Sequence, residues 1–140
     1  MTDWRSNGVR VVPADALDDR TPQTPGMHRA TAVSGDTVGS KNLWVGRVTL
    51  IPSARSGPHH HGNAESVICV TAGRIRLRYG ARLQDSIEAG PGDYIYVPPR
   101  VIHQEINLSP SDPIDSIVIR DSQVNVVVNV VLPDEIVLER

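Results

Sequence analysis

The feature that most constrains the fold is a succession of short β-rich runs separated by turn residues. Residues 74–79 show the pattern most clearly, because arginine and apolar residues alternate strictly along them. Successive side chains of a strand point to opposite faces, so this run has one apolar face and one face of arginines in water. The chain holds about nine or ten such runs, no amphipathic helical pattern and no useful repeat. The pattern predicts an all-β sandwich or barrel.

The length of 140 residues favours a single domain over residues 1–140. Within it we expect N-terminal strands or an arm over residues 1–40 and the barrel over residues 41–132. The runs at residues 9–12 and 124–132 are rich in valine. Exposed apolar edge strands invite pairing with a second chain, so we expect a homodimer joined partly through these two runs. The other expected strands are residues 28–33, 43–51, 66–70, 74–79, 82–88, 94–97, 103–107 and 115–120.

The composition argues against two classes of partner. The formal net charge is −2, and no polybasic run is present, which argues against a nucleic acid or an anionic membrane surface. No apolar run approaches the roughly 20 residues of a membrane-spanning helix. The polar start of the chain shows no secretory signal, and the single cysteine, Cys69, cannot form an intrachain disulfide. These features predict a cytoplasmic protein in which Cys69 is an inert, buried side chain.

The stretch Gly57–Glu65 contains three consecutive histidines. In an extended chain His59 and His61 share one face, roughly 6–7 Å apart, and can converge on one metal ion. Glu65 follows after a short turn and can supply an oxygen ligand. A histidine run alone is equally compatible with a solvated loop. The position of Glu65, and of His103 in a second stretch over residues 92–107, favours a metal site.

These two stretches resemble the two signature motifs of the cupin superfamily, in particular its small, single-domain, germin-like metal-binding members. Together they span about residues 57–107, and both occur in the expected order. The chain departs from the motifs in the spacing of Gly57 and Gly73 and in Arg100, which stands where the second motif has glycine. The matching residues are Gly57, His59, His61, Glu65, Gly73, Gly92, Pro98, His103 and Asn107.

The resemblance implies a double-stranded β-helix, also called a jelly-roll barrel, that is open at the end where the ligands lie. It also implies that His59, His61, Glu65 and His103 bind one divalent metal ion. Three imidazoles and one carboxylate suit Fe(II), Mn(II), Ni(II), Co(II), Zn(II) or Cu(II), because no soft sulfur ligand is present. We favour Fe(II) or Mn(II), since a zinc hydrolase usually has three protein ligands and a water.

The resemblance implies an enzyme, and we expect a dioxygenase that acts on a small organic molecule. Cupins with this ligand set also include decarboxylases and isomerases of sugars or organic acids, which is the first alternative. A cupin that binds a small ligand without catalysis is the second alternative. The sequence does not specify the substrate.

Glu105 is the one candidate catalytic residue. In an extended segment His103, Glu105 and Asn107 project to one face, which brings Glu105 near the metal site. There it can orient an imidazole or move a proton. The alternative is that Glu105 pairs with an arginine at the rim of the barrel.

Overall fold

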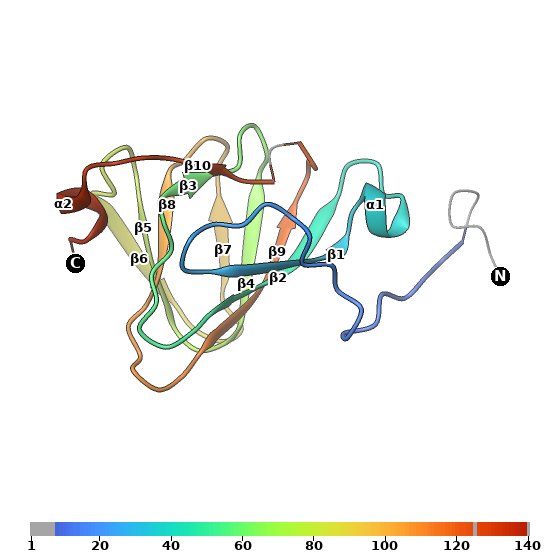
Figure 1. Ribbon diagram of the computed structural model, residues 1–140, viewed down its shortest axis with the longest axis horizontal. Helices are drawn as coiled ribbons and strands as arrows, with labels where there is room; N and C mark the ends of the chain where they lie inside the picture. The colour runs from blue at the N-terminus through green and yellow to red at the C-terminus, as the bar shows by residue number, and fades with distance from the viewer. Residues whose placement is uncertain (1–7, 125, 140) are drawn as a thin grey trace.

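The computed structural model describes residues 8–124 and 126–139, and two antiparallel β-sheets form its body (Figure 1). The first sheet has five strands in the order β1-β2-β9-β4-β7. Its inner face is made by alternate residues of each strand, as the burial pattern of β9 shows. The strands of the first sheet are β1 (His28–Val33), β2 (Trp44–Leu50), β4 (Ser66–Ala72), β7 (Tyr94–Val97) and β9 (Ile114–Arg120).

The second sheet also has five strands, in the order β10-β3-β8-β5-β6. From β2 onward the chain changes sheet after almost every strand, so strands distant in sequence become neighbours. This winding is the expected double-stranded β-helix, and it confirms the all-β prediction. The strands of the second sheet are β3 (His59–His60), β5 (Ile75–Tyr79), β6 (Asp85–Ala89), β8 (His103–Asn107) and β10 (Val128–Asn129).

The apolar core lies between the two sheets. Val70, Ile75 and Ile114 are fully buried there, and Leu50 and Val48 lie beside them in the same cluster. Each occupies the inward phase of its strand, which is why alternation in the sequence identified the strands correctly. The packed core therefore sets the distance between the two sheets, and with it the positions of the polar residues that face the interior.

The two runs near the ends of the chain differ from their predicted form. Residues 9–12 are not a strand, because no described strand pairs with this run in a sheet and Pro13 ends it; Val9 and Val11 are therefore exposed. Among the described residues of the run 124–132, Val128 and Asn129 alone form a strand, β10. The homodimer joined partly through these runs stays a prediction.

Two short helices complete the described fold, α1 (Gly35–Val38) and α2 (Asp134–Val137). Helix α2 covers the outer side of the second sheet, where Arg78 donates to the carbonyl of Ile136 at 2.8 Å. Arg78 is therefore buried, and the prediction of three solvated arginines on β5 is wrong for this one. Within the described residues, neither helix is long and apolar enough to cross a membrane.

The turn before β8 contains Arg100 at the position where the second motif has glycine. Arg100 adopts φ of 63°, in the left-handed region that favours glycine. Its backbone N–H donates to the carbonyl of Gly62 at 2.8 Å, and its Nε donates to Oδ1 of Asn63 at 2.8 Å. These contacts hold the tight turn with an arginine in place of the glycine. They also tie the loop after β3 to the start of β8.

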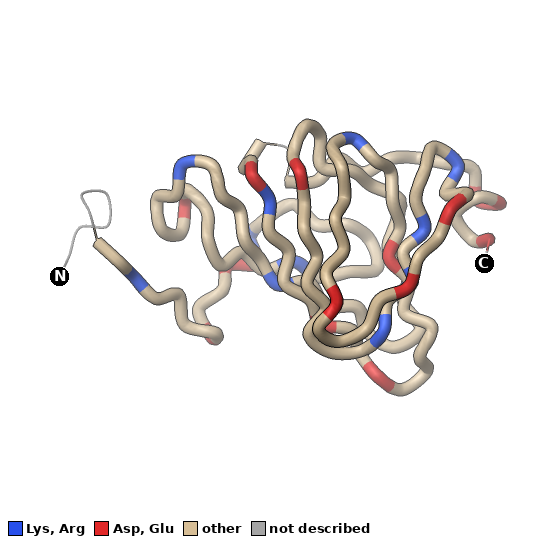
Figure 2. The backbone as a smooth tube through the Cα atoms, turned by 180° about the vertical axis from the view of Figure 1, so that it is seen from behind, with Lys and Arg blue, Asp and Glu red and all other residues tan. Residues whose placement is uncertain are grey.

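Charged residues of both signs are interspersed along the chain, as Figure 2 shows. Several make ion pairs on the sheet surfaces, such as Arg47 with Asp115 at 3.1 Å and Arg74 with Glu88 at 3.2 Å. Exposed pairs of this kind contribute about 0–1 kcal/mol each. Arg29, Arg120 and Glu105 differ from them, because their side chains are buried between the sheets.

Candidate metal centre

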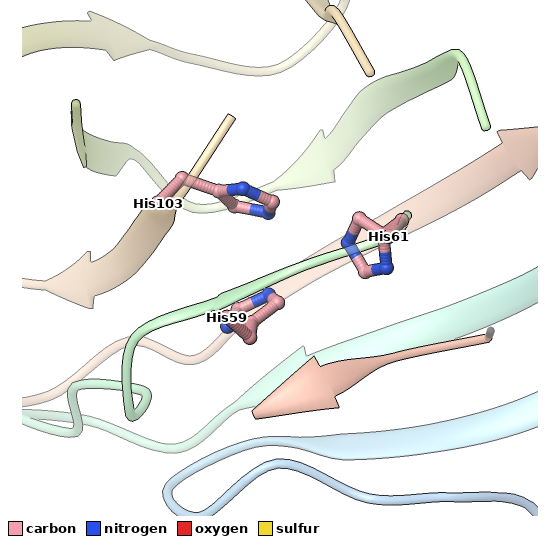
Figure 3. A group of neighbouring side chains, drawn as sticks. All are labelled: His59, His61 and His103. Atoms are coloured by element: carbon pink, nitrogen blue, oxygen red, sulfur yellow. The ribbon is translucent and has the colours of Figure 1, made fainter. Parts of the chain in front are cut away.

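The three histidines of the two motifs meet inside the barrel. His59 of β3 pairs in register with His103 of β8, and His61 directly follows β3. The ring centroid of His59 lies 4.3 Å from that of His103 and 5.2 Å from that of His61. Figure 3 shows the three imidazoles grouped around a common space. His60 lies between them in sequence and is not part of the group, as the alternation of an extended chain predicted.

Backbone carbonyls fix the orientation of all three imidazoles. The Nδ1 atom of His59 lies 2.9 Å from the carbonyl oxygen of Gly57, and that of His103 lies 2.9 Å from the carbonyl oxygen of Val101. The Nδ1 atom of His61 lies 2.7 Å from the carbonyl oxygen of Val126. A carbonyl can only accept, so each Nδ1 carries the proton and donates it. The Nε2 lone pairs are left free, which is the tautomer that a metal ligand requires.

Burial keeps two of these imidazoles neutral. It lowers the pKa of His103 to about 3, and the neighbouring charge of His59 acts in the same direction. Burial also lowers the pKa of His61, with a further contribution from the charge of Arg120. At neutral pH both rings are therefore unprotonated. Their lone pairs are available without the loss of a proton.

The donor set fits a metal ion. One ring nitrogen from each of His59, His61 and His103 lies within 4.8 Å of the other two. Metal–nitrogen bonds are about 2.0–2.1 Å long, so a single ion between the three rings can reach all of them with small adjustments. The Nε2 of His59 is buried without a hydrogen-bond partner among the described residues. Three buried histidines can therefore hold one metal ion.

Glu105 is the carboxylate that the structure places beside this group. It lies on β8 two residues after His103 and is buried, with Oε2 3.5 Å from Nε2 of His59. Burial would raise the pKa of its carboxyl, but His59, His103 and Arg29 outweigh that effect and lower it. Glu105 is therefore ionised at neutral pH. It lies inside the barrel and not at the rim, and its catalytic role remains a prediction.

Glu65 does not join the group, contrary to the expectation from the motif. Its side chain is exposed, and it accepts a hydrogen bond from the hydroxyl of Tyr96 on the outer face of the first sheet. The reason is the phase of β4, where Ser66, Ile68 and Val70 point inward and the residue before Ser66 points outward. The inward position nearest the histidines is occupied by Ser66.

A small cavity lies between the histidines and the first sheet. It measures about 10 Å³, about the space of one water molecule or ion. His61, His103 and Glu105 line it on one side. Arg29, Arg120 and Ser66 also line it, and none of these last three was predicted from the sequence as a site residue. The inward phase of β9, which runs Ile114, Ser116, Val118, Arg120, contained a signal for Arg120. The opposite phase contains Ile117 and Ile119 and is equally apolar, so the pattern did not reveal which face was buried.

Comparisons with known proteins agree with the fold. The structure superposes on a protein with a double-stranded β-helix domain from Klebsiella pneumoniae, with a TM-score of 0.67 and 14% identity over 89% of this chain and 100% of that one. It superposes on oxalate oxidase with a TM-score of 0.71 and 19% identity, over 92% of this chain and 65% of that one. No curated protein matches the sequence significantly.

A third similar structure is a sugar phosphate isomerase of the cupin superfamily from Silicibacter pomeroyi. It has a TM-score of 0.55 and 26% identity, over 68% of this chain and 60% of that one. The family model described as the cupin domain matches residues 46–119, which is more than half of the chain. The matched segment runs from β2 to β9 and includes all three histidines. This chain belongs to the cupin family.

Proposed function

We propose that this cupin is an enzyme with one divalent metal ion, held by His59, His61 and His103, and that it oxidises a small organic molecule with dioxygen. The observation that carries the proposal is the common orientation of the three imidazoles. Each Nδ1 donates to a backbone carbonyl, so each Nε2 lone pair is free inside a buried site. Such an arrangement is expected of metal ligands.

Fe(II) or Mn(II) is the ion that we favour. Nitrogen ligands without sulfur suit either metal, and affinity alone does not choose between the candidate ions. When bound, such an ion supplies the activation of dioxygen. The similarity to oxalate oxidase supports an oxidising enzyme at the level of the fold.

The surrounding residues exclude water and hold a proton acceptor. The three rings are at most 6% exposed, so bulk water does not reach the donor atoms. Glu105 is ionised and lies 3.5 Å from Nε2 of His59. From there it can orient His59 or accept a proton from a bound substrate. Glu65 has neither position, because it bonds with Tyr96 outside the barrel.

A metal-dependent isomerase or decarboxylase is the second candidate. Proton transfer between two carbons needs a buried base and no dioxygen, and Glu105 fits this requirement. The similarity to the sugar phosphate isomerase favours the same candidate. Binding of a small ligand without catalysis stays as the third candidate. We also retain the expectations of a small-molecule substrate, a homodimer and a cytoplasmic location as predictions.

Oxygen uptake by the metal-loaded protein, measured against a panel of small organic molecules, tests the proposal. We expect uptake with Fe(II) or Mn(II) and none with Zn(II) for at least one compound. Full turnover of that compound under anaerobic conditions, or equal turnover with Zn(II), contradicts the oxygenase and favours the isomerase or decarboxylase.

A further inference from the structure

The wall of the cavity that faces the histidines is formed by the inner side of the first sheet. Arg120 of β9 pairs in register with Ser66 of β4 on one side and with Trp44 of β2 on the other. Arg29 of β1 lines the same cavity. All of these side chains are at most 2% exposed. Two guanidinium groups and a hydroxyl therefore face the candidate metal centre across about 10 Å³ of space.

Several donors in this wall have no hydrogen-bond partner among the residues that the structure describes. Nε and Nη1 of Arg120, Nε of Arg29 and Oγ of Ser66 are buried and without a hydrogen bond to any described residue. No described carboxylate forms an ion pair with either arginine. An unsatisfied buried donor is costly, and a buried charge without a partner is more costly still. A cluster of four such atoms around one cavity indicates a missing acceptor.

The two guanidinium groups are nevertheless held in place. Arg120 lies over the ring of Trp44, with its Cζ 4.1 Å from the ring centroid. Trp44 can occupy this position because residue 46 is glycine, where a Cβ would lie 2.3 Å from the Trp44 ring. Arg29 donates through Nη1 to Oγ1 of Thr24 at 2.8 Å. These contacts orient the arginines and leave other N–H groups free, as expected of a preorganised binding site.

The charge balance indicates that the missing acceptor is an anion. Burial lowers the pKa of Arg29 to about 10 and that of Arg120 to about 9, so both remain cations at neutral pH. Among the described residues, two guanidinium groups and a single carboxylate, that of Glu105, line the cavity, so cationic side chains outnumber anionic ones there. An uncompensated positive charge in a low-dielectric interior attracts an anionic ligand.

We propose that Arg120, Arg29 and Ser66 bind the carboxylate group of a small organic acid, which is the substrate of the metal centre. The inference rests on the proposed function and names its substrate class. A carboxylate offers several lone pairs to the free N–H and O–H donors, and guanidinium groups match its planar geometry. The cavity measures about 10 Å³, so its lining must move to admit any ligand, and a planar carboxylate needs a smaller displacement than a tetrahedral phosphate.

Binding of formate, the smallest carboxylate, tests the proposal by isothermal titration calorimetry of Zn(II)-loaded protein. Zn(II) prevents turnover, and elemental analysis of each sample gives its metal content. We expect wild-type protein to bind formate, and Arg120→Met to bind it about 10- to 100-fold more weakly, because hydrogen bonds to charged groups are strong. Arg47→Met is the matched control, since Arg47 is exposed and pairs with Asp115 on the surface. It should bind formate like wild type.

The thermal midpoint separates ligand binding from a structural role. Without formate, Arg120→Met should unfold at the wild-type temperature or above, because an unpaired buried charge has been removed. A lower midpoint with unchanged formate affinity would assign Arg120 to structure and contradict the proposal. If Arg120→Met does not fold, Ser66→Ala serves instead, with an expected loss of about 3- to 10-fold in formate affinity. Unchanged affinity in Ser66→Ala would then contradict the site.

Two further outcomes are decisive. Inorganic phosphate that binds more tightly than formate would contradict the carboxylate assignment. Protein with one metal ion per chain that fails to bind formate would contradict the anion site and leave the metal centre standing. If no metal binds, the proposed function fails, and formate is titrated into metal-free protein. In that case the anion site stands only if Arg120→Met still weakens binding.

Discussion

The interior of this barrel has two ends that are equally buried and chemically opposite. Along β9 the inward side chains pass from Ile114 at one end to Arg120 at the other, and both are almost completely inaccessible. Around Ile114 the neighbours are apolar and well packed. Around Arg120 they are histidines, a carboxylate and a second arginine. Burial alone therefore does not distinguish the part that stabilises this fold from the part that binds a ligand.

The difference between the two ends lies in how polar groups are satisfied. Asn107 is buried at the apolar end, and its Nδ2 donates to the carbonyl of Asp112 at 2.8 Å while its Oδ1 accepts from Ser109 at 3.0 Å. At the other end Ser66 and Arg120 lack such partners among the described residues. A buried polar residue with all its hydrogen bonds made within the protein has a structural role. A buried polar residue without them needs a partner from outside the protein, such as a ligand, an ion or an ordered water.

Truncation at the apolar end should have the largest effect on stability. Ile114→Ala removes a fully buried side chain from the core and should lower the free energy of unfolding by about 2–5 kcal/mol. Urea denaturation measures this change. The folded variant should retain its metal, since Ile114 does not line the cavity. A loss below about 1 kcal/mol would mean that this end is not the part that stabilises the fold.

Acid should destabilise the metal-free protein through the polar end. The His103 imidazole takes a proton near pH 6.5 when unfolded and near pH 3 when folded, so between these values the unfolded state binds more protons. The free energy of unfolding should therefore fall as the pH falls from 6.5, by up to about 1.4 kcal/mol per pH unit for this one group. The lowered pKa of Glu105 acts in the same direction below about pH 4.5.

Urea denaturation of chelator-treated protein at pH 7 and pH 5 measures the acid effect. In His103→Gln the free energy of unfolding should fall less between pH 7 and pH 5 than in the wild type, because the contribution of one imidazole is absent. The matched control is His28→Gln, because His28 is exposed and lies near Asp19. If His28→Gln reduced the acid-induced loss of stability as much as His103→Gln does, the assignment of that loss to the buried His103 ring would be contradicted.

The two glutamates provide a sharper contrast. Glu105→Gln should weaken metal binding about 10- to 100-fold, because the carboxylate beside His59 is neutralised. Glu65→Gln is the matched control, and its metal affinity should stay within about twofold of wild type, since its side chain bonds with Tyr96 outside the barrel. Competition with a metal chelator measures both affinities. If Glu65→Gln weakened metal binding more than Glu105→Gln, Glu65 would be the carboxylate ligand, as the motif implied.

The smallest effect is expected on stability at Glu65. The contact with Tyr96 is exposed, so Glu65→Gln should change the free energy of unfolding by less than about 1 kcal/mol. Urea denaturation at pH 7 measures the change. A loss of several kcal/mol would show that this contact stabilises the loop between β3 and β4 far more than an exposed hydrogen bond does.

The sequence predicted most of the strands and the group of histidines for one physical reason and missed the arginines for another. Alternation with a period of two located β5 and the shared face of His59 and His61, because it depends on the backbone alone. It could not identify the inward face of β9, where both phases contain isoleucine or valine. Arg120 became a candidate only when the pairing of β9 with β4 placed it opposite Ser66.

The limit of a pattern read within one strand also explains why the positions of Glu65 and Arg78 differ from the expectation. Motif spacing placed a glutamate near the histidines, but a shift of one residue in phase turns a side chain from the interior to the surface. Ser66 took the inward position and Glu65 the outward one. Arg78 was expected in water because nothing in its own strand showed that α2 would cover it. Contacts of this kind depend on segments that lie far apart in sequence.

The central claim is that His59, His61 and His103 hold one metal ion at the polar end of the barrel. Elemental analysis of protein purified without a histidine tag and dialysed against a mixture of divalent ions tests it directly, with His61→Ala as the comparison. The account predicts about one ion per chain in the wild type and almost none in a folded His61→Ala variant, because the ion loses one of three nitrogen ligands. Wild-type protein without metal, or a His61→Ala variant with an equal metal content, would contradict it.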